Sequence, residues 1–196
     1  MSKGEHTRER IVERAFLLAG RDGLNGLSLG SLSDALNMSK SGLFAHFGSK
    51  EELQVAVLKH AADAFTEQVI KPALKAPRGL PRLEAMFNHW LEWGTNPKMP
   101  GGCLFPQASA ELDDHWGAPR SVLVSSQQAL LATIARAARL CVEEGHFRSD
   151  LDTEQFAFEA QGLILGFHHS FRLLRDPKAM KRARAAFARL LDSAKP

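Results

Sequence analysis

The segment from residue 38 to residue 53, MSKSGLFAHFGSKEEL, brings several hydrogen-bond donors together. Serine hydroxyls, lysine ammonium groups and a histidine ring are groups that phosphate oxygens and base edges of a nucleic acid accept. The donors are Ser39, Lys40, Ser41, His46 and Lys50, and Gly42 between them lets the backbone approach a partner closely. This chemistry indicates DNA binding. An ordinary solvated helix face has the same composition, so these residues alone leave both interpretations open.

Cys103 offers a second kind of chemistry, in the stretch Gly101-Gly102-Cys103-Leu104-Phe105. A thiolate near a helix start is stabilised, which would suit a sensor of oxidants or electrophiles. Paired with a histidine, the same thiol could act as the nucleophile of a hydrolase. No nucleophile motif, glycine-rich phosphate loop or telling carboxylate pair accompanies it, so we do not expect an enzyme. The alternative is a small buried hydrophobic residue.

Neither a metal ion nor another cofactor is expected. The chain has only two cysteines, Cys103 and Cys141, and no C-x-x-C spacing. The adjacent pair His168-His169 points about 100° apart on a helix, which is unsuitable for gripping one ion jointly.

Helical spacing of apolar residues continues along the whole chain, and no stretch alternates with the period of a strand. Thr7, Ser28 and Ser39 are candidate N-caps, and Ser49 with Glu52 has the capping-box spacing. With Pro72 as a stop, the predicted helices span about 7–20, 28–36, 39–47, 49–72, 108–113, 119–144, 152–174 and 177 onward, and a helical apolar stripe follows Pro81 through Leu91. The sequence therefore predicts an all-α fold.

Two of these predicted helices, 28–36 and 39–47, are short and separated by a tight turn. This is the layout of a helix-turn-helix motif, in which the second helix enters the major groove of DNA. Leu43 and Phe47, four residues apart, would hold that helix against the first helix and turn its polar face outward.

The N-terminal part, from Thr7 to Leu58, resembles the DNA-binding domain of TetR-type (tetracycline repressor-like) transcriptional regulators. The resemblance is carried by Ser28 before Leu32-Ser-Asp-Ala-Leu36, by Ser39-Lys40, and above all by Leu43-Phe44-x-His46-Phe47-x-Ser49-Lys50-Glu51-x-Leu53. It implies a three-helix DNA-binding domain over residues 1–50 and a helical ligand-binding and dimerisation domain over 51–196. The family commonly has tyrosine where this chain has Phe44, and Gly followed by Ser, Thr or Asn where it has Ser41-Gly42.

Carried over residue by residue, the resemblance implies phosphate contacts from Ser28, His46 and Lys50. It also implies groove-facing positions, which are Ser39, Lys40, Ser41, Gly42 and Phe44. The implied function is a transcriptional regulator, most often a repressor that binds a palindromic operator as a dimer and is released by a ligand. A redox- or electrophile-sensing repressor that uses Cys103 is the alternative within the same family.

The helix predicted around residues 153–175 is apolar on two faces, so two neighbours are needed to bury it. One face would pack on its own subunit and the other on the twin helix of a homodimer. The residues expected at that interface are Phe158, Gly162, Leu165, Gly166 and Leu173, with Phe187 from the last helix. The alternative is a helix buried wholly within its own monomer.

Aromatic residues gather on the segments that the resemblance assigns to ligand binding. The candidate ligand-binding residues are Phe65, Phe87, Trp90, Trp93, Cys103, Phe105, Gln127, Phe167 and His168. A pocket lined by such side chains suits a small hydrophobic or aromatic effector. The alternative for each aromatic residue is a place in the core.

The overall composition is that of a globular protein. The chain has 196 residues, of which 44% are hydrophobic and 24% charged, and its net charge of +3 mildly favours an anionic partner such as DNA. No apolar run approaches the roughly 20 residues that cross a bilayer, and MSKGEHTRER lacks the apolar core of a secretory signal. The sequence predicts a cytoplasmic protein without a membrane partner.

Overall fold

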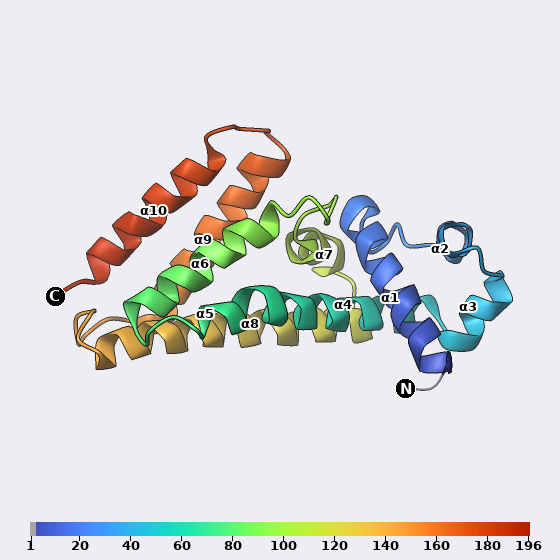
Figure 1. Ribbon diagram of the computed structural model, residues 1–196, viewed down its shortest axis with the longest axis horizontal. Helices are drawn as coiled ribbons and strands as arrows, with labels where there is room; N and C mark the ends of the chain where they lie inside the picture. The colour runs from blue at the N-terminus through green and yellow to red at the C-terminus, as the bar shows by residue number, and fades with distance from the viewer. Residues whose placement is uncertain (1–2) are drawn as a thin grey trace. The chain divides into compact units, whose positions relative to one another are not determined.

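The structure is a computed structural model that describes residues 3–196, except for the side chains of Lys3 and Phe44 (Figure 1). Within these residues the chain is helical and contains no strand, which confirms the predicted all-α fold. The elements are α1 (Lys3–Asp22), α2 (Leu29–Leu36), α3 (Lys40–His46), α4 (Lys50–Phe65), the π-helix η1 (Thr66–Ile70), α5 (Lys71–Ala73), α6 (Leu80–Gly94), α7 (Leu104–Leu112), α8 (Ala118–Glu143), α9 (Thr153–Arg172) and α10 (Ala179–Ala194). None of the described helices combines the length and hydrophobicity that a membrane span requires.

The chain forms two compact units, each built from two separate stretches of sequence. The first unit combines residues up to 64 with residues 96–126, and the second combines 65–95 with 127–196. The first unit therefore contains α7 as well as α1, α2 and α3. A boundary between functional domains at residue 50 stays a prediction.

Side chains that cap helix ends explain where several helices begin. Ser28 accepts the N–H of Ser31 at the start of α2, and Ser39 accepts the N–H of Gly42 at the start of α3. Both caps confirm the predictions. Ser49 accepts the N–H of Glu52 as predicted, but the Glu52 carboxylate returns to the N–H of Gly48 rather than to that of Ser49.

One predicted helix start is wrong. α1 already begins at Lys3, so Thr7 lies within the helix and does not cap it. The predicted end at Pro72 agrees with the structure to within one residue, because the helical stretch that begins with α4 ends at Ala73. A proline cannot donate to the preceding turn and its ring crowds that turn, and the chain accommodates it by widening into η1, where Lys71 N–H reaches the carbonyl of Thr66.

In the second unit α9 and α10 pack side by side, and α6 contacts α9 (Figure 1). Phe87 of α6 stacks on Phe187 of α10 with ring centroids 3.7 Å apart, and both side chains are buried. The sequence analysis grouped Phe187 with the dimer-interface residues. That assignment stays a prediction, since the stack occupies one face of the ring within its own subunit.

The loop before α7 approaches α1 at backbone distance. A Cβ atom added to Gly101 would lie 1.4 Å from the carbonyl oxygen of Gly20. Any side chain at position 101 would therefore push the two backbones apart. This contact joins α1 to a segment about eighty residues further along the chain.

Replacing Gly101 with alanine should destabilise the protein by about 3 kcal/mol, since backbone atoms must move to admit the methyl group. Urea unfolding followed by circular dichroism measures the change. Gly30→Ala is the matched control, because the nearest atoms to its added Cβ would be 3.7 Å and 3.9 Å away. Equal stability of the two variants would contradict the close contact.

Candidate DNA-binding surface and ligand-binding residues

The short helices α2 and α3 follow each other across residues 37–39 in the first unit (Figure 1). Asn37 ends α2 in the left-handed conformation with φ 52°, and Met38 N–H returns to the carbonyl of Ser33 at 3.0 Å. Leu43 and Phe47 are 0% and 1% exposed, so α3 turns its apolar side into the core as predicted. This is the geometry of a helix-turn-helix.

Most candidate DNA contacts are accessible in this arrangement. The exposed members are Ser28, Ser39, Lys40, Ser41 and Lys50, and the half-buried ones are Gly42 and His46. The side chain of Phe44 lies outside what the structure describes. The individual contacts with DNA stay predictions.

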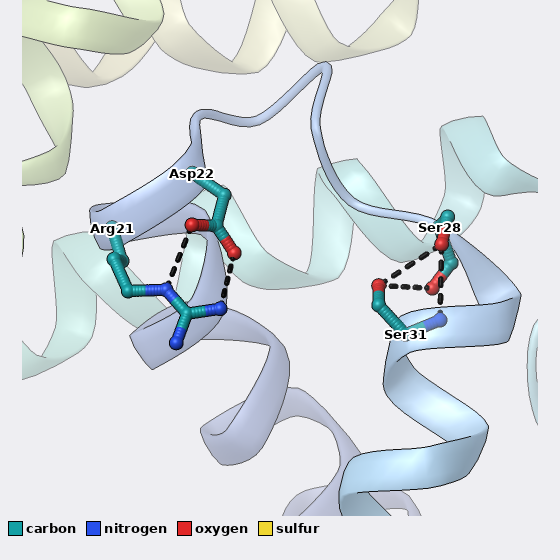
Figure 2. Close-up of polar contacts among 4 residues, drawn as sticks. All are labelled: Arg21, Asp22, Ser28 and Ser31. Carbon is teal, nitrogen blue, oxygen red and sulfur yellow. Dashed lines mark hydrogen bonds and ion pairs between the residues drawn. The ribbon is translucent and has the colours of Figure 1, made fainter.

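All three candidate hydroxyls already have structural partners, since Ser41 Oγ lies 3.1 Å from Ser39 Oγ and the other two hydroxyls cap their own helices. Figure 2 shows Ser28 Oγ accepting the N–H of Ser31 at 3.0 Å, with the two hydroxyl oxygens 2.9 Å apart. Ser39 Oγ accepts the N–H of Gly42 at 3.1 Å. The hydroxyl oxygens of Ser28 and Ser39 therefore each stabilise the first turn of their own helix by accepting a backbone N–H, and the hydroxyl proton can still be donated to a phosphate.

The loop between α1 and α2 holds contacts that the sequence analysis missed. Lys50 Nζ donates to the carbonyl oxygen of Asn25 at 2.6 Å, and the buried Gln54 donates from Nε2 to that of Leu24 at 3.1 Å. An ammonium group has three protons, so Lys50 retains donors for a phosphate. Before the loop, Arg21 pairs in a bidentate manner with its neighbour Asp22, as Figure 2 shows.

The candidate ligand-binding residues are divided between the two units. Cys103 and Phe105 are buried in the first unit. The second unit contains the others, which are Phe65, Phe87, Trp90, Trp93, Gln127, Phe167 and His168. The ring of Phe65 meets those of Trp90 and Trp93 edge to face, at centroid distances of 5.4 Å and 5.9 Å. These rings form an aromatic cluster, whereas Phe87 is occupied by its stack with Phe187.

Polar atoms between α8 and α9 remain unpaired. Gln161 Nε2 donates to Gln127 Oε1 at 3.1 Å, which fixes the orientation of the Gln127 amide. Among the residues that the structure describes, Gln127 Nε2 and His168 Nε2 are buried without a hydrogen-bond partner. Burial, with Arg172 and His169 adding repulsion, lowers the pKa of His168, so its ring is neutral near pH 7. Such groups are able to bind an oxygen-bearing ligand.

The outer face of α9 is apolar and uncovered in the single chain. Phe158, Leu165 and Leu173 are 67%, 48% and 68% exposed. Apart from the helix's own backbone and the adjacent residues, no described atom lies within 4 Å of a Cβ added at Gly162 or Gly166. The alternative of a helix buried wholly within its own monomer is therefore wrong.

Both cysteines are buried, and neither forms a disulfide within the described residues. Cys103 is the N-cap residue of α7 and is 6% exposed, which limits the access that a sensing thiol needs. The redox alternative therefore stays a prediction. Burial, and secondarily the carboxylate of Glu84, raises the pKa of the Cys141 thiol to about 12. This thiol is protonated at neutral pH.

Family sequence models match both parts of the chain. Residues 11–57 match "Bacterial regulatory proteins, tetR family", and residues 79–187, more than half of the chain, match "Tetracyclin repressor-like, C-terminal domain". No curated protein sequence matches the chain.

Solved structures share the fold over nearly the whole chain. A TetR transcriptional regulator from Chloroflexus aurantiacus is 23% identical with a TM-score of 0.87, covering 98% of this chain and 96% of that one. A TetR-family regulator from Cytophaga hutchinsonii is 20% identical with a TM-score of 0.87, covering 100% and 98%. AibR, solved with isovaleryl coenzyme A and operator DNA, is 23% identical with a TM-score of 0.74, covering 91% and 94%.

In a Cys103→Ser variant, the remaining Cys141 thiol should not react with Ellman's reagent while the protein is folded and should react fully in denaturant. Because the folded pKa lies above the ordinary 9.0, the thiol's stabilising contribution is complete below pH 9 and is lost as pH rises to about 12. Cys141→Ala is the control for this pH dependence. Rapid reaction of the folded variant would contradict the burial.

Proposed function

Because this chain belongs to the TetR family of bacterial regulators, we propose that it is a repressor released from its operator by a small ligand. Members of this family are DNA-binding proteins and not enzymes. The observation that carries the proposal is the helix-turn-helix of the first unit, with α3 anchored by Leu43 and Phe47. A family model over residues 11–57 supports it.

At the operator, α3 enters the major groove and presents Ser39, Lys40 and Ser41 to the DNA. Ser28, His46 and Lys50 contact phosphates, which set register and orientation. The segment offers few cations for one chain, since only Lys40 and Lys50 lie between Ser28 and Lys50. Binding by two copies at once is therefore needed for a useful affinity.

The second copy packs on the outer face of α9. Phe158, Leu165 and Leu173 supply the apolar area, while Gly162 and Gly166 let the partner helix approach closely. The two α3 helices of the dimer then enter successive major grooves about 34 Å apart, which corresponds to a palindromic operator.

The effector binds in the second unit, at the aromatic cluster of Phe65, Trp90 and Trp93. Its apolar part contacts these rings, and an oxygen atom pairs with the unsatisfied Gln127 or His168. The binding of isovaleryl coenzyme A by AibR is in keeping with such an effector, since its acyl group is apolar. The effector lowers DNA affinity if it binds more tightly to the conformation whose α3 spacing does not fit the operator.

Lys50→Ala and His46→Ala should each weaken binding to DNA from the promoter region of the chain's own gene by about tenfold. Lys50→Ala should also reduce the slope of log affinity against log salt by about 2, since a dimer then loses two phosphate contacts. Fluorescence anisotropy over a salt series measures both. Lys59→Ala, which removes an exposed cation further along α4, is the control. Unchanged affinity of both variants would overturn the assigned contacts.

Leu165→Glu should convert the dimer to a monomer and abolish operator binding, because two carboxylates would be buried in the interface. Sedimentation velocity reports the oligomeric state. Leu74→Glu introduces the same change at another exposed leucine, 54% accessible, and should leave the dimer intact. A Leu165→Glu variant that stays dimeric would reject the α9 interface.

A further inference from the structure

The loop between α1 and α2 is held by side chains from two helices that are far apart in the sequence. Glu111 of α7 accepts the backbone N–H of Leu24 at 3.2 Å and that of Asn25 at 2.6 Å. The carbonyl oxygens of the same two residues accept Gln54 and Lys50 of α4. The backbone N–H and carbonyl groups of both residues are therefore satisfied by side chains, because α7 supplies the acceptor and α4 supplies the donors.

The neighbouring backbone fits closely around the same carboxylate. Gly23 adopts φ 86°, and a Cβ added to it would lie 2.2 Å from Glu111 Oε1. One turn earlier on α7, the Gln107 amide donates to the carbonyl of Gly20 at 3.2 Å and accepts the N–H of Gly23 at 3.1 Å, in the orientation that satisfies both. α7 thus binds the end of α1 and the start of the loop through two side chains.

This loop leads directly to the DNA-binding surface. Figure 2 shows it as the stretch of chain between Asp22 and Ser28, the N-cap of α2. Lys50, the second anchor of the loop, is itself a proposed phosphate contact. Hydrogen bonds that involve a charged group are stronger than those between neutral groups, and Glu111 makes two of them to the loop whereas Lys50 makes one.

We propose that Glu111 is a positioning residue for operator binding. From α7 its carboxylate fixes Leu24 and Asn25, and through them the positions of Ser28 and Lys50 that contact phosphates. The proposal rests on the proposed function, because it assigns a role in the same DNA complex. It gives α7, which the family's C-terminal model covers, an indirect part in DNA binding.

The sign of the effect separates positioning from simple electrostatics. A carboxylate near DNA repels the phosphates. If only the charge of Glu111 mattered, its removal would therefore strengthen DNA binding. Loss of the loop attachment has the opposite result, since the phosphate-binding groups then sample positions that do not fit the backbone of the DNA. A weakened complex therefore identifies the positioning role.

The experiment uses the full-length chain and a duplex that the wild-type protein selects from a random-sequence pool. Glu111→Ala should raise the Kd roughly tenfold, equivalent to about 1.4 kcal/mol. The Kd of Glu111→Gln should lie between those of the wild type and Glu111→Ala, because the amide oxygen of glutamine still accepts one of the two N–H groups. Asp113→Ala is the control. It removes the same charge two residues away, where the Asp113 carboxylate accepts only the N–H of its neighbour Asp114, and it should bind no more weakly than wild type.

Two further measurements exclude a loss of folding. Kd values are compared at a temperature where circular dichroism shows every variant folded, and hydrogen exchange of the Leu24 and Asn25 amides reports the attachment directly. Faster exchange at these amides together with weaker operator binding supports the proposal. A lower melting temperature with an unchanged Kd overturns it and leaves the proposed function intact. A wild-type protein that selects no sequence overturns both.

Discussion

The DNA-binding surface depends on the burial of one side of a helix that could not form alone. α3 has seven residues and α2 has eight, whereas isolated helices shorter than about 12–15 residues are marginal in water. Leu43 and Phe47 supply the stabilisation that helix propensity does not, since both side chains are almost completely buried. The guanidinium carbon of Arg8 also lies over the Phe47 ring, 4.6 Å from its centroid. Because these two side chains secure the helix, its outward positions are free to carry serine and lysine.

The parts of the structure set by local chemistry could be predicted from the sequence. The caps at Ser28 and Ser39 depend on residues three positions away, and periodic apolar residues extend over each long helix. The family resemblance then supplied the roles of the helices. A local signal failed at Thr7, which has the chemistry of a cap although helical residues precede it. The proline at position 72 marked the end of the helix to within one residue, but not the wider turn η1 before it.

The contacts that connect distant segments could not be predicted. Glu111 binds residues 86 and 87 positions earlier, and nothing in the sequence around it distinguishes it from a solvated glutamate. Periodicity also placed Phe187 and Phe158 in one group, although one ring stacks on Phe87 and the other is 67% exposed. An apolar stripe indicates that the side chains on that helix face pack against another element. Whether that element belongs to the same chain depends on the tertiary structure.

The discontinuous make-up of the first unit limits how regulators of this kind can be recombined. Residues 96–126 belong to the packing unit of the helix-turn-helix, and Gly101 contacts Gly20 backbone to backbone. A chimaera joined at a single point after α4 would pair this N-terminal part with a foreign α7 and lose both its glycine contact and its carboxylate anchor. A chimaera that combines the DNA specificity of this protein with another ligand-binding domain therefore requires two crossovers, so that residues 96–126 are transferred together with the helix-turn-helix.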